Sequence, residues 1–185
     1  MTLKYNAPTT LTLTLICGVV LLLDMIVPGL TENWFAVPGR GGFDAGSVRD
    51  YLRLFTHILG HADLNHFLSN FALILLLGPI LESNYGSGGM LIMILITAFV
   101  TGILNVLVFS TGLMGASGIV FMMILLSSFT NFNKGELPLT FILILLLYLG
   151  RELINAFSNN NISEFGHIIG GLCGSIFGYI RPHRR

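Results

Sequence analysis

The fold is decided by a long uncharged stretch, GMLIMILITAFVTGILNVLVF, at residues 89–109. A helix of about 20 consecutive apolar residues is enough to cross the ~30 Å hydrocarbon core of a bilayer. The whole chain has the same character, since 54% of its 185 residues are hydrophobic, only 10% are charged, and the mean hydropathy is +0.82. A soluble domain carries about 25% charged residues. The sequence therefore predicts an all-α, polytopic membrane protein.

Five further apolar stretches flank this one, so the sequence predicts six membrane spans in all. Turn-forming residues separate them, such as Pro28-Gly29 after the first and Asn159-Asn160-Asn161 before the last. No stretch is long and polar enough for a separate soluble domain, and we expect residues 1–185 to form a single membrane domain. The six predicted spans are residues 9–27, 64–82, 89–109, 115–130, 138–156 and 165–180.

The basic residues indicate an orientation. Arg181, Arg184 and Arg185 directly follow the last span, and positive charges beside a span favour the cytoplasmic side. With six spans the N-terminus is then cytoplasmic as well, which predicts a multi-pass membrane protein with both termini inside. Segment 28–63 would lie outside. Its mixture of aromatic and charged residues fits either amphipathic helices in the membrane interface or a plain external loop.

Polar side chains cluster at the starts of the second, fourth and sixth predicted spans. Such groups are costly in a membrane and are therefore candidates for function. Alternate spans run in the same direction, so these three starts lie on one side of the membrane. Ser117 and His167 each lie about three residues into their spans, and at a rise of ~1.5 Å per residue their depths match within one turn. A serine beside a neutral histidine can act as a nucleophile activated by a base.

Other polar and small residues could support this pair. His66 and Asn70 lie four residues apart on one helical face, so both could donate to an oxyanion, together with the backbone N–H of Ser117. Glycines recur every four residues in the last span, a pattern that lets two helix backbones approach closely. We expect the partner to be the fourth span. Two alternatives without catalysis remain. Ser117 could be a small residue that allows close helix packing, and His167 could make an interhelical hydrogen bond. The repeating glycines are Gly166, Gly170, Gly174 and Gly178.

Nucleic-acid binding and metal binding find little support. The net charge is zero, whereas nucleic-acid partners favour basic proteins. His57 and His61 have a spacing that can bind zinc on a helix, but Asp63 is the only carboxylate nearby. We therefore predict no metal and no cofactor. Cys17 and Cys173 lie in apolar stretches and are expected to be small buried residues.

Three motifs together resemble those of the rhomboid family of intramembrane proteases. The stretch His61-Ala-Asp-Leu-Asn-His66-Phe-Leu-Ser-Asn70 is similar to the family's H-x4-H-x3-N. Gly115-Ala116-Ser117-Gly118 matches its G-A-S-G, and Gly166-His167-Ile-Ile-Gly170 resembles its A-H-x-x-G. The resemblance covers about residues 50–180 and fits a bundle of six transmembrane helices.

The resemblance implies a serine endopeptidase that cuts membrane-anchored proteins in or near their transmembrane segments. Ser117 would be the nucleophile and His167 its base, without an acidic third member. His66 and Asn70 would stabilise the oxyanion. The implied partners are transmembrane protein substrates and the lipid bilayer. The residues implied to have structural roles near the site are His61, Arg53, Gly115, Gly118, Phe121, Gly170 and Gly174.

The chain departs from the family pattern at three positions. Leu52 stands where the family has Trp before Arg53, and Gly166 replaces Ala. Phe121 stands where many members have Tyr, so an aromatic face is kept and a hydroxyl is lost. Two other functions compete with the protease: a catalytically inactive rhomboid-like protein that binds membrane clients, and a small membrane transporter. The sequence leaves the substrate and the oligomeric state open.

Overall fold

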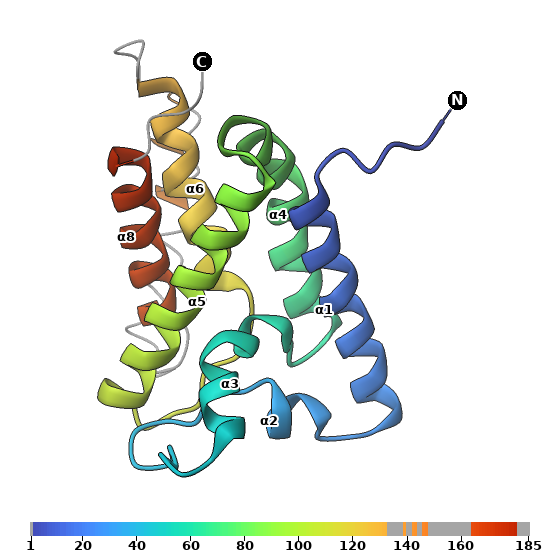
Figure 1. The fold of residues 1–185 in the computed structure, drawn as a ribbon, viewed down its shortest axis with the longest axis vertical. Coiled ribbons are helices and arrows are strands. Elements are labelled where there is room, and N and C mark those ends of the chain that lie inside the picture. The colour runs from blue at the N-terminus through green and yellow to red at the C-terminus, as the bar shows by residue number, and fades with distance from the viewer. Residues whose placement is uncertain (1, 133–138, 140–141, 144–145, 148–163, 181–185) are drawn as a thin grey trace.

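The computed structural model describes residues 2–132, 139, 142–143, 146–147 and 164–180. Within these residues the chain is helical, with one isolated β-bridge and no strand (Figure 1). The long helices are α1 (Pro8–Ile26), α4 (Leu64–Tyr85), α5 (Ser87–Val108), α6 (Ser117–Phe132) and α8 (Glu164–Ile180). The short ones are α2 (Leu30–Trp34), α3 (Val48–Thr56) and the 3-10 helix η1 (His57–Leu59).

The prediction of an all-α fold is confirmed for the described residues. Five of the six predicted spans coincide with α1, α4, α5, α6 and α8 to within a few residues at each end. By length and composition α1, α4 and α5 could each cross a membrane, while α6 and α8 contain shorter apolar segments. Apart from isolated positions, the predicted fifth span at 138–156 lies outside the described residues.

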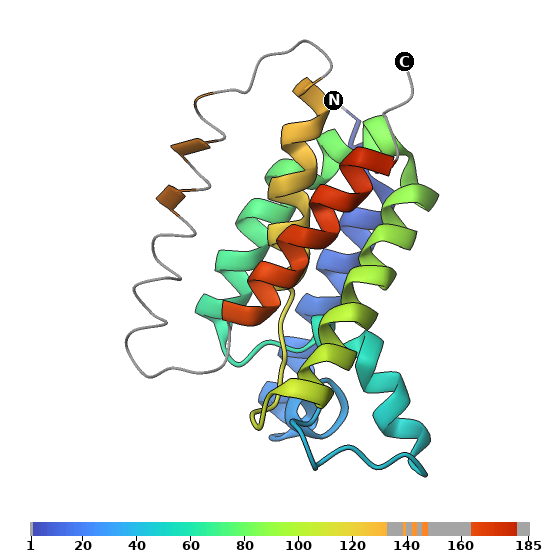
Figure 2. The ribbon, with the colours of Figure 1, turned by 90° about the vertical axis from the view of Figure 1, so that its left-hand side faces the viewer.

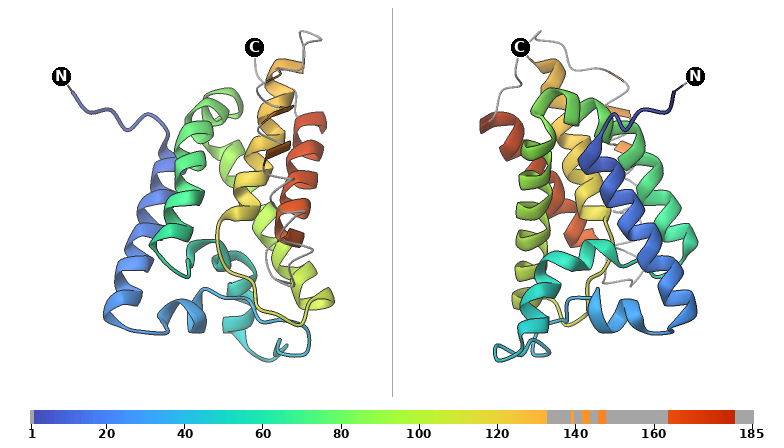
Figure 3. Two further views of the ribbon diagram at one scale, coloured as in Figure 1. Left: turned by 180° about the vertical axis from the view of Figure 1, so that it is seen from behind. Right: turned by 45° about the vertical axis from the view of Figure 1, so that its right-hand side comes forward.

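Three helices run in the same direction and two run against them. In Figures 1 and 2, α4, α6 and α8 all begin toward the end of the bundle that carries α2 and α3, whereas α1 and α5 run the other way. Figure 3 shows from two further sides that α1 packs beside α4 and that α6 lies against α8. The polar starts of α4, α6 and α8 are therefore brought to a common side, as the alternation of spans predicts.

The buried core lies where α4, α5 and α6 meet. Ile74 of α4, Met93 of α5 and Met122 of α6 are almost fully buried there. Equally apolar residues such as Leu76 and Leu107 are exposed, at 62% and 61% of their surface. In a lipid environment apolarity does not drive helices together, so close packing decides which face is internal.

Segment 28–63 is folded, and α3 turns its apolar side outward. Val48, Leu52 and Phe55 are exposed on α3, while Asp50 and Arg53 are buried. The Arg53 guanidinium donates to Asp50 Oδ1 at 2.9 Å and to the Asn33 carbonyl, which ties α3 to α2. A helix with its Asp50–Arg53 pair inside and an apolar row outside favours the interfacial interpretation of this segment over a plain loop.

The N-terminus of α1 is fixed by a buried carboxylate of α4. Glu82 Oε1 accepts the Thr9 N–H at 2.8 Å, and Oε2 accepts the Thr10 N–H at 3.0 Å and its hydroxyl at 2.8 Å. The first N–H groups of a helix have no partner within the helix, and a negative charge there is favourable. Gly78, one turn before Glu82, lets α1 approach closely, because a Cβ at that position would collide with the Thr10 side chain.

We predict that Glu82→Ala lowers the free energy of unfolding by about 1–3 kcal/mol, since hydrogen bonds to a charged group are lost and buried donors remain. Thermal unfolding in one detergent measures the effect. Glu32→Ala is the matched control, because the Glu32 side chain is exposed. Equal melting temperatures for the two variants would contradict the proposed role of Glu82.

Candidate active site

Ser117 is the first residue of α6 and is partly exposed. The chain reaches it through an irregular segment at residues 109–116. Gly115 in this segment has a φ of +112°, a backbone conformation that residues with a Cβ rarely adopt. The Ser117 N–H lies at a helix N-terminus, where it is not used by the helix itself. The serine hydroxyl and a donor for an anion therefore occur at the same residue.

The segment before Ser117 is held by hydrogen bonds to three other parts of the chain. Val37 and Leu113 exchange two backbone hydrogen bonds of 3.0 Å. The Gly115 N–H donates to the His57 carbonyl at 2.9 Å. The Ala116 N–H donates to His61 Nε2 at 3.4 Å. Segment 28–63 thus holds the backbone on the N-terminal side of Ser117 at Leu113, Gly115 and Ala116.

His57 and His61 are both buried and both uncharged at neutral pH. Burial lowers the pKa of His57 to about 4, against a partly opposing hydrogen bond between its Nε2 and the Ala98 carbonyl. Burial also lowers the pKa of His61 to about 4, and the nearby His66 lowers it further. Because His61 Nε2 accepts the Ala116 N–H, its ring must be neutral with the proton on Nδ1. The His61 ring thus bonds the segment before Ser117 directly, whereas the His57 ring bonds the Ala98 carbonyl of α5 and its backbone carbonyl accepts the Gly115 N–H.

His167 lies in the first turn of α8 and is buried. Its ring stacks on Phe121, with ring centroids 4.5 Å apart and ring planes within 8° of parallel. Phe121 follows Ser117 by four residues, so both lie on the same face of α6. The stack therefore holds the imidazole beside the face of α6 that carries Ser117.

Close backbone contact between α6 and α8 sets the height of His167. A Cβ on Gly170 would collide with the carbonyl of Gly118 and come within 2.9 Å of its Cα. A Cβ on Gly174 would collide in the same way with the carbonyl of Met122. The contact of Gly170 and Gly174 with the fourth predicted span is confirmed. Gly118 completes it, since a Cβ there would lie 3.3 Å from the Gly166 carbonyl oxygen.

The start of α4 brings two further polar side chains to the same place. The His66 ring lies against Gly115: a Cβ built on Gly115 would be 2.7 Å from His66 Cε1 and Nε2, and 3.8 Å from Asn70 Nδ2. His66 is also within electrostatic range of His167. Asn70 Nδ2 is buried, and no hydrogen-bond acceptor reaches it within the described part of the chain. The Asn70 amide is thus an available donor beside Gly115, which precedes Ser117 by two residues.

The structure separates the predicted residues into two groups. Those of α4, α6, α8 and the segment before α6 lie around the start of α6, except Gly174, which packs further along against Met122. Arg53 instead braces α2 and α3. His57, which the sequence singles out only for its spacing from His61, is 1% exposed, and its backbone carbonyl accepts the Gly115 N–H. Among the described residues, no three potential metal ligands converge.

The comparisons with known proteins agree with this geometry. The rhomboid domain matches residues 48–184, which is most of the chain. The chain belongs to the rhomboid family. It is similar to the rhomboid protease GlpG of Haemophilus influenzae, with 25% identity over 131 residues that cover 69% of this chain and 68% of that protein. The resemblance drawn from the three motifs is confirmed. Together with its long apolar helices, membership of this family makes the chain a multi-pass membrane protein.

Replacing Gly170 or Gly174 with Ala should lower the melting temperature, because each methyl group would push α8 away from the α6 backbone. Gly171→Ala is the matched control. A Cβ on Gly171 meets only the Leu125 side chain, at 3.6 Å, and Ala is better than Gly in a helix by about 1 kcal/mol. Thermal unfolding in the same detergent measures all three. If Gly171→Ala were as harmful as Gly170→Ala, the close contact of α6 with α8 would not be the cause.

Proposed function

We propose that this rhomboid protein is an intramembrane serine endopeptidase that cleaves membrane-anchored proteins in or near their transmembrane segments. The observation that supports it best is the stack of His167 on Phe121, one turn from Ser117. A base held beside a serine at a helix start is what acyl transfer requires. The relative named above is described as a protease, in keeping with this proposal.

In this proposal Ser117 Oγ attacks the scissile carbonyl while His167 takes its proton. His167 later returns the proton to the leaving amine, and a water molecule hydrolyses the acyl intermediate by the same route in reverse. The tetrahedral intermediates carry a negative oxygen. The Ser117 N–H, the Asn70 amide and the His66 ring are candidate donors to that oxygen, and the α6 N-terminus adds a favourable dipole.

The proposal also includes an orientation and a place in the cell. Both termini would be cytoplasmic, so Ser117 would lie toward the outer side of a bacterial inner membrane. Substrates would be single-span proteins that enter from the bilayer. The catalytic pair needs no metal or cofactor, because the serine itself is the nucleophile.

A fluorophosphonate probe tests the nucleophile directly, since it reacts with activated serines. We expect labelling of the wild-type protein at Ser117, and more than 90% loss in Ser117→Ala and in His167→Ala, since nucleophile and base act as one unit. Ser83→Ala, at the far end of α4, should label normally. Cleavage of single-span proteins in liposomes, followed by product mass, should show the same pattern. A folded wild-type protein that neither labels nor cleaves would favour the client-binding function.

The oxyanion donors should act mainly on turnover. His66→Ala and Asn70→Ala are each expected to lower kcat by roughly 10²–10³ with little change in KM, because donors aimed at developing charge act in the transition state. Ser69→Ala is the matched control on the same helix, since Ser69 is exposed and its hydroxyl donates to the His66 carbonyl one turn back. A rise in KM at unchanged kcat would instead give His66 a structural role.

A further inference from the structure

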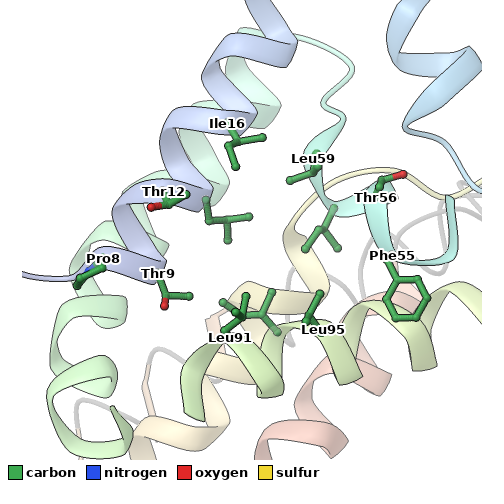
Figure 4. Close-up of a pocket in the computed structure, with 12 residues that line it drawn as sticks. Pro8, Thr9, Thr12, Ile16, Phe55, Thr56, Leu59, Leu91 and Leu95 are labelled. Carbon is green, nitrogen blue, oxygen red and sulfur yellow. The ribbon is translucent and has the colours of Figure 1, made fainter. Parts of the chain in front are cut away.

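An apolar groove runs along α1 on the side that faces α3 and α5. It begins as a cavity of about 390 Å³ between α1, α5 and the end of α3 (Figure 4). A second cavity of about 310 Å³ continues it between α1, α2 and α3. Thr56 lines both cavities. The volume of each is within the range of small-molecule sites in proteins, about 300–1,000 Å³.

The residues that α1 contributes lie along one face of the helix. They recur at intervals of three or four positions, which is the spacing of a single helical stripe. Between the first and the last, the groove follows α1 for about 21 Å at ~1.5 Å per residue. That exceeds the ~15 Å depth of one half of a hydrocarbon core. The α1 residues at this spacing are Thr9, Thr12, Ile16, Val20 and Leu23, and Pro8 and Leu13 beside them also line the first cavity.

The groove is open to its surroundings. Ile16 on α1 and Leu91 and Leu95 on α5 are 43%, 48% and 42% exposed. Because α1 and α5 are membrane-spanning helices, what faces this opening is the hydrocarbon of the bilayer. A second helix with its side chains is about 10–12 Å across, too wide for cavities of this volume. A single hydrocarbon chain is narrow enough to enter.

The end of the groove near α2 and α3 is different in chemistry. Arg49 lines the second cavity, and its side chain is 47% exposed. Its Nε lies 4.0 Å from Asp50 Oδ1, a long contact, because that oxygen already accepts Arg53 Nη1 at 2.9 Å. Trp34 lines the same cavity and is 52% exposed. Arg recognises phosphate through its fork of N–H donors, and Trp favours the level of the lipid headgroups.

We propose that this groove binds one anionic phospholipid, with its phosphate at Arg49 and one acyl chain along α1. The chain would fill the space between α1 and α5, and the headgroup would join α3 to the end of α1. The lipid would therefore stabilise segment 28–63, which holds the backbone before Ser117. This site is separate from the catalytic residues and does not depend on the proposed protease activity.

Trp34 is the single tryptophan of the chain, so its fluorescence reports on the groove without labelling. Bromine on an acyl chain quenches a nearby tryptophan. The purified protein in detergent is titrated with phosphatidylglycerol or phosphatidylcholine brominated near the carboxyl end of one acyl chain. We expect quenching that saturates near one lipid per protein, with half-saturation at about fivefold less phosphatidylglycerol than phosphatidylcholine, given the attraction of one basic residue for an anionic headgroup.

Two pairs of variants locate the binding. Arg49→Gln should abolish the preference for phosphatidylglycerol. Arg40→Gln removes a charge from the same segment 28–63 at a residue that does not line the groove, so this variant should keep the preference. Leu95→Phe narrows the groove and should weaken the quenching by both lipids. Leu107→Phe is the same change on an exposed part of α5 that does not line the groove. Ile16→Phe replaces Leu95→Phe if the latter fails to fold by thermal melting.

Other outcomes would overturn the proposal. Quenching that rises without saturation, equally for both lipids and for Leu95→Phe, would mean a non-specific lipid shell. Equal loss of preference in Arg49→Gln and Arg40→Gln would mean a general effect of surface charge. Unchanged quenching in Leu95→Phe together with a smaller mass by light scattering would make the groove a contact between two copies of the chain.

Discussion

The contact of α6 with α8 at backbone distance governs the rest of the structure. In lipid the apolar side chains of two helices gain nothing by leaving their surroundings, so helices associate where their surfaces fit. Gly170 against Gly118 and Gly174 against Met122 provide that fit. This contact sets how far His167 stands along α6, and the Phe121 ring then sets the plane of the imidazole. The relation of His167 to the start of α6 follows from both.

The second constraint is the need to satisfy the irregular backbone that joins two apolar helices, α5 and α6. Segment 109–116 is not helical, and unpaired N–H and C=O groups are costly away from water. Val37, His57 and His61 meet this need by pairing with Leu113, Gly115 and Ala116 in turn. The bond to Ala116 requires a neutral His61 ring, which burial provides by lowering its pKa. Segment 28–63 is therefore part of the support of the site.

Helix α4 joins the two ends of the molecule. His66 and Asn70 stand at its start beside Gly115, and Glu82 near its end holds the N-terminus of α1. A displacement of α4 would thus change both the surroundings of Ser117 and the position of the N-terminus of α1. The groove along α1 lies on the side of α1 that faces α3 and α5, and no residue of α4 lines it. It adds a place where the membrane itself could stiffen the fold.

The sequence by itself determined the helical membrane class, five of the observed long helices, the common side of the polar starts, and the close packing of Gly170 and Gly174. These depend on local periodicity and on the alternation of spans, which a single chain displays directly. Only the tertiary structure decided the roles of His57, Val37 and Glu82. Each acts through a hydrogen bond to a distant part of the chain, 72 residues away for Glu82 and Thr10. A hydrogen bond depends on distance and direction in space, and neither is encoded in the spacing of residues along the sequence.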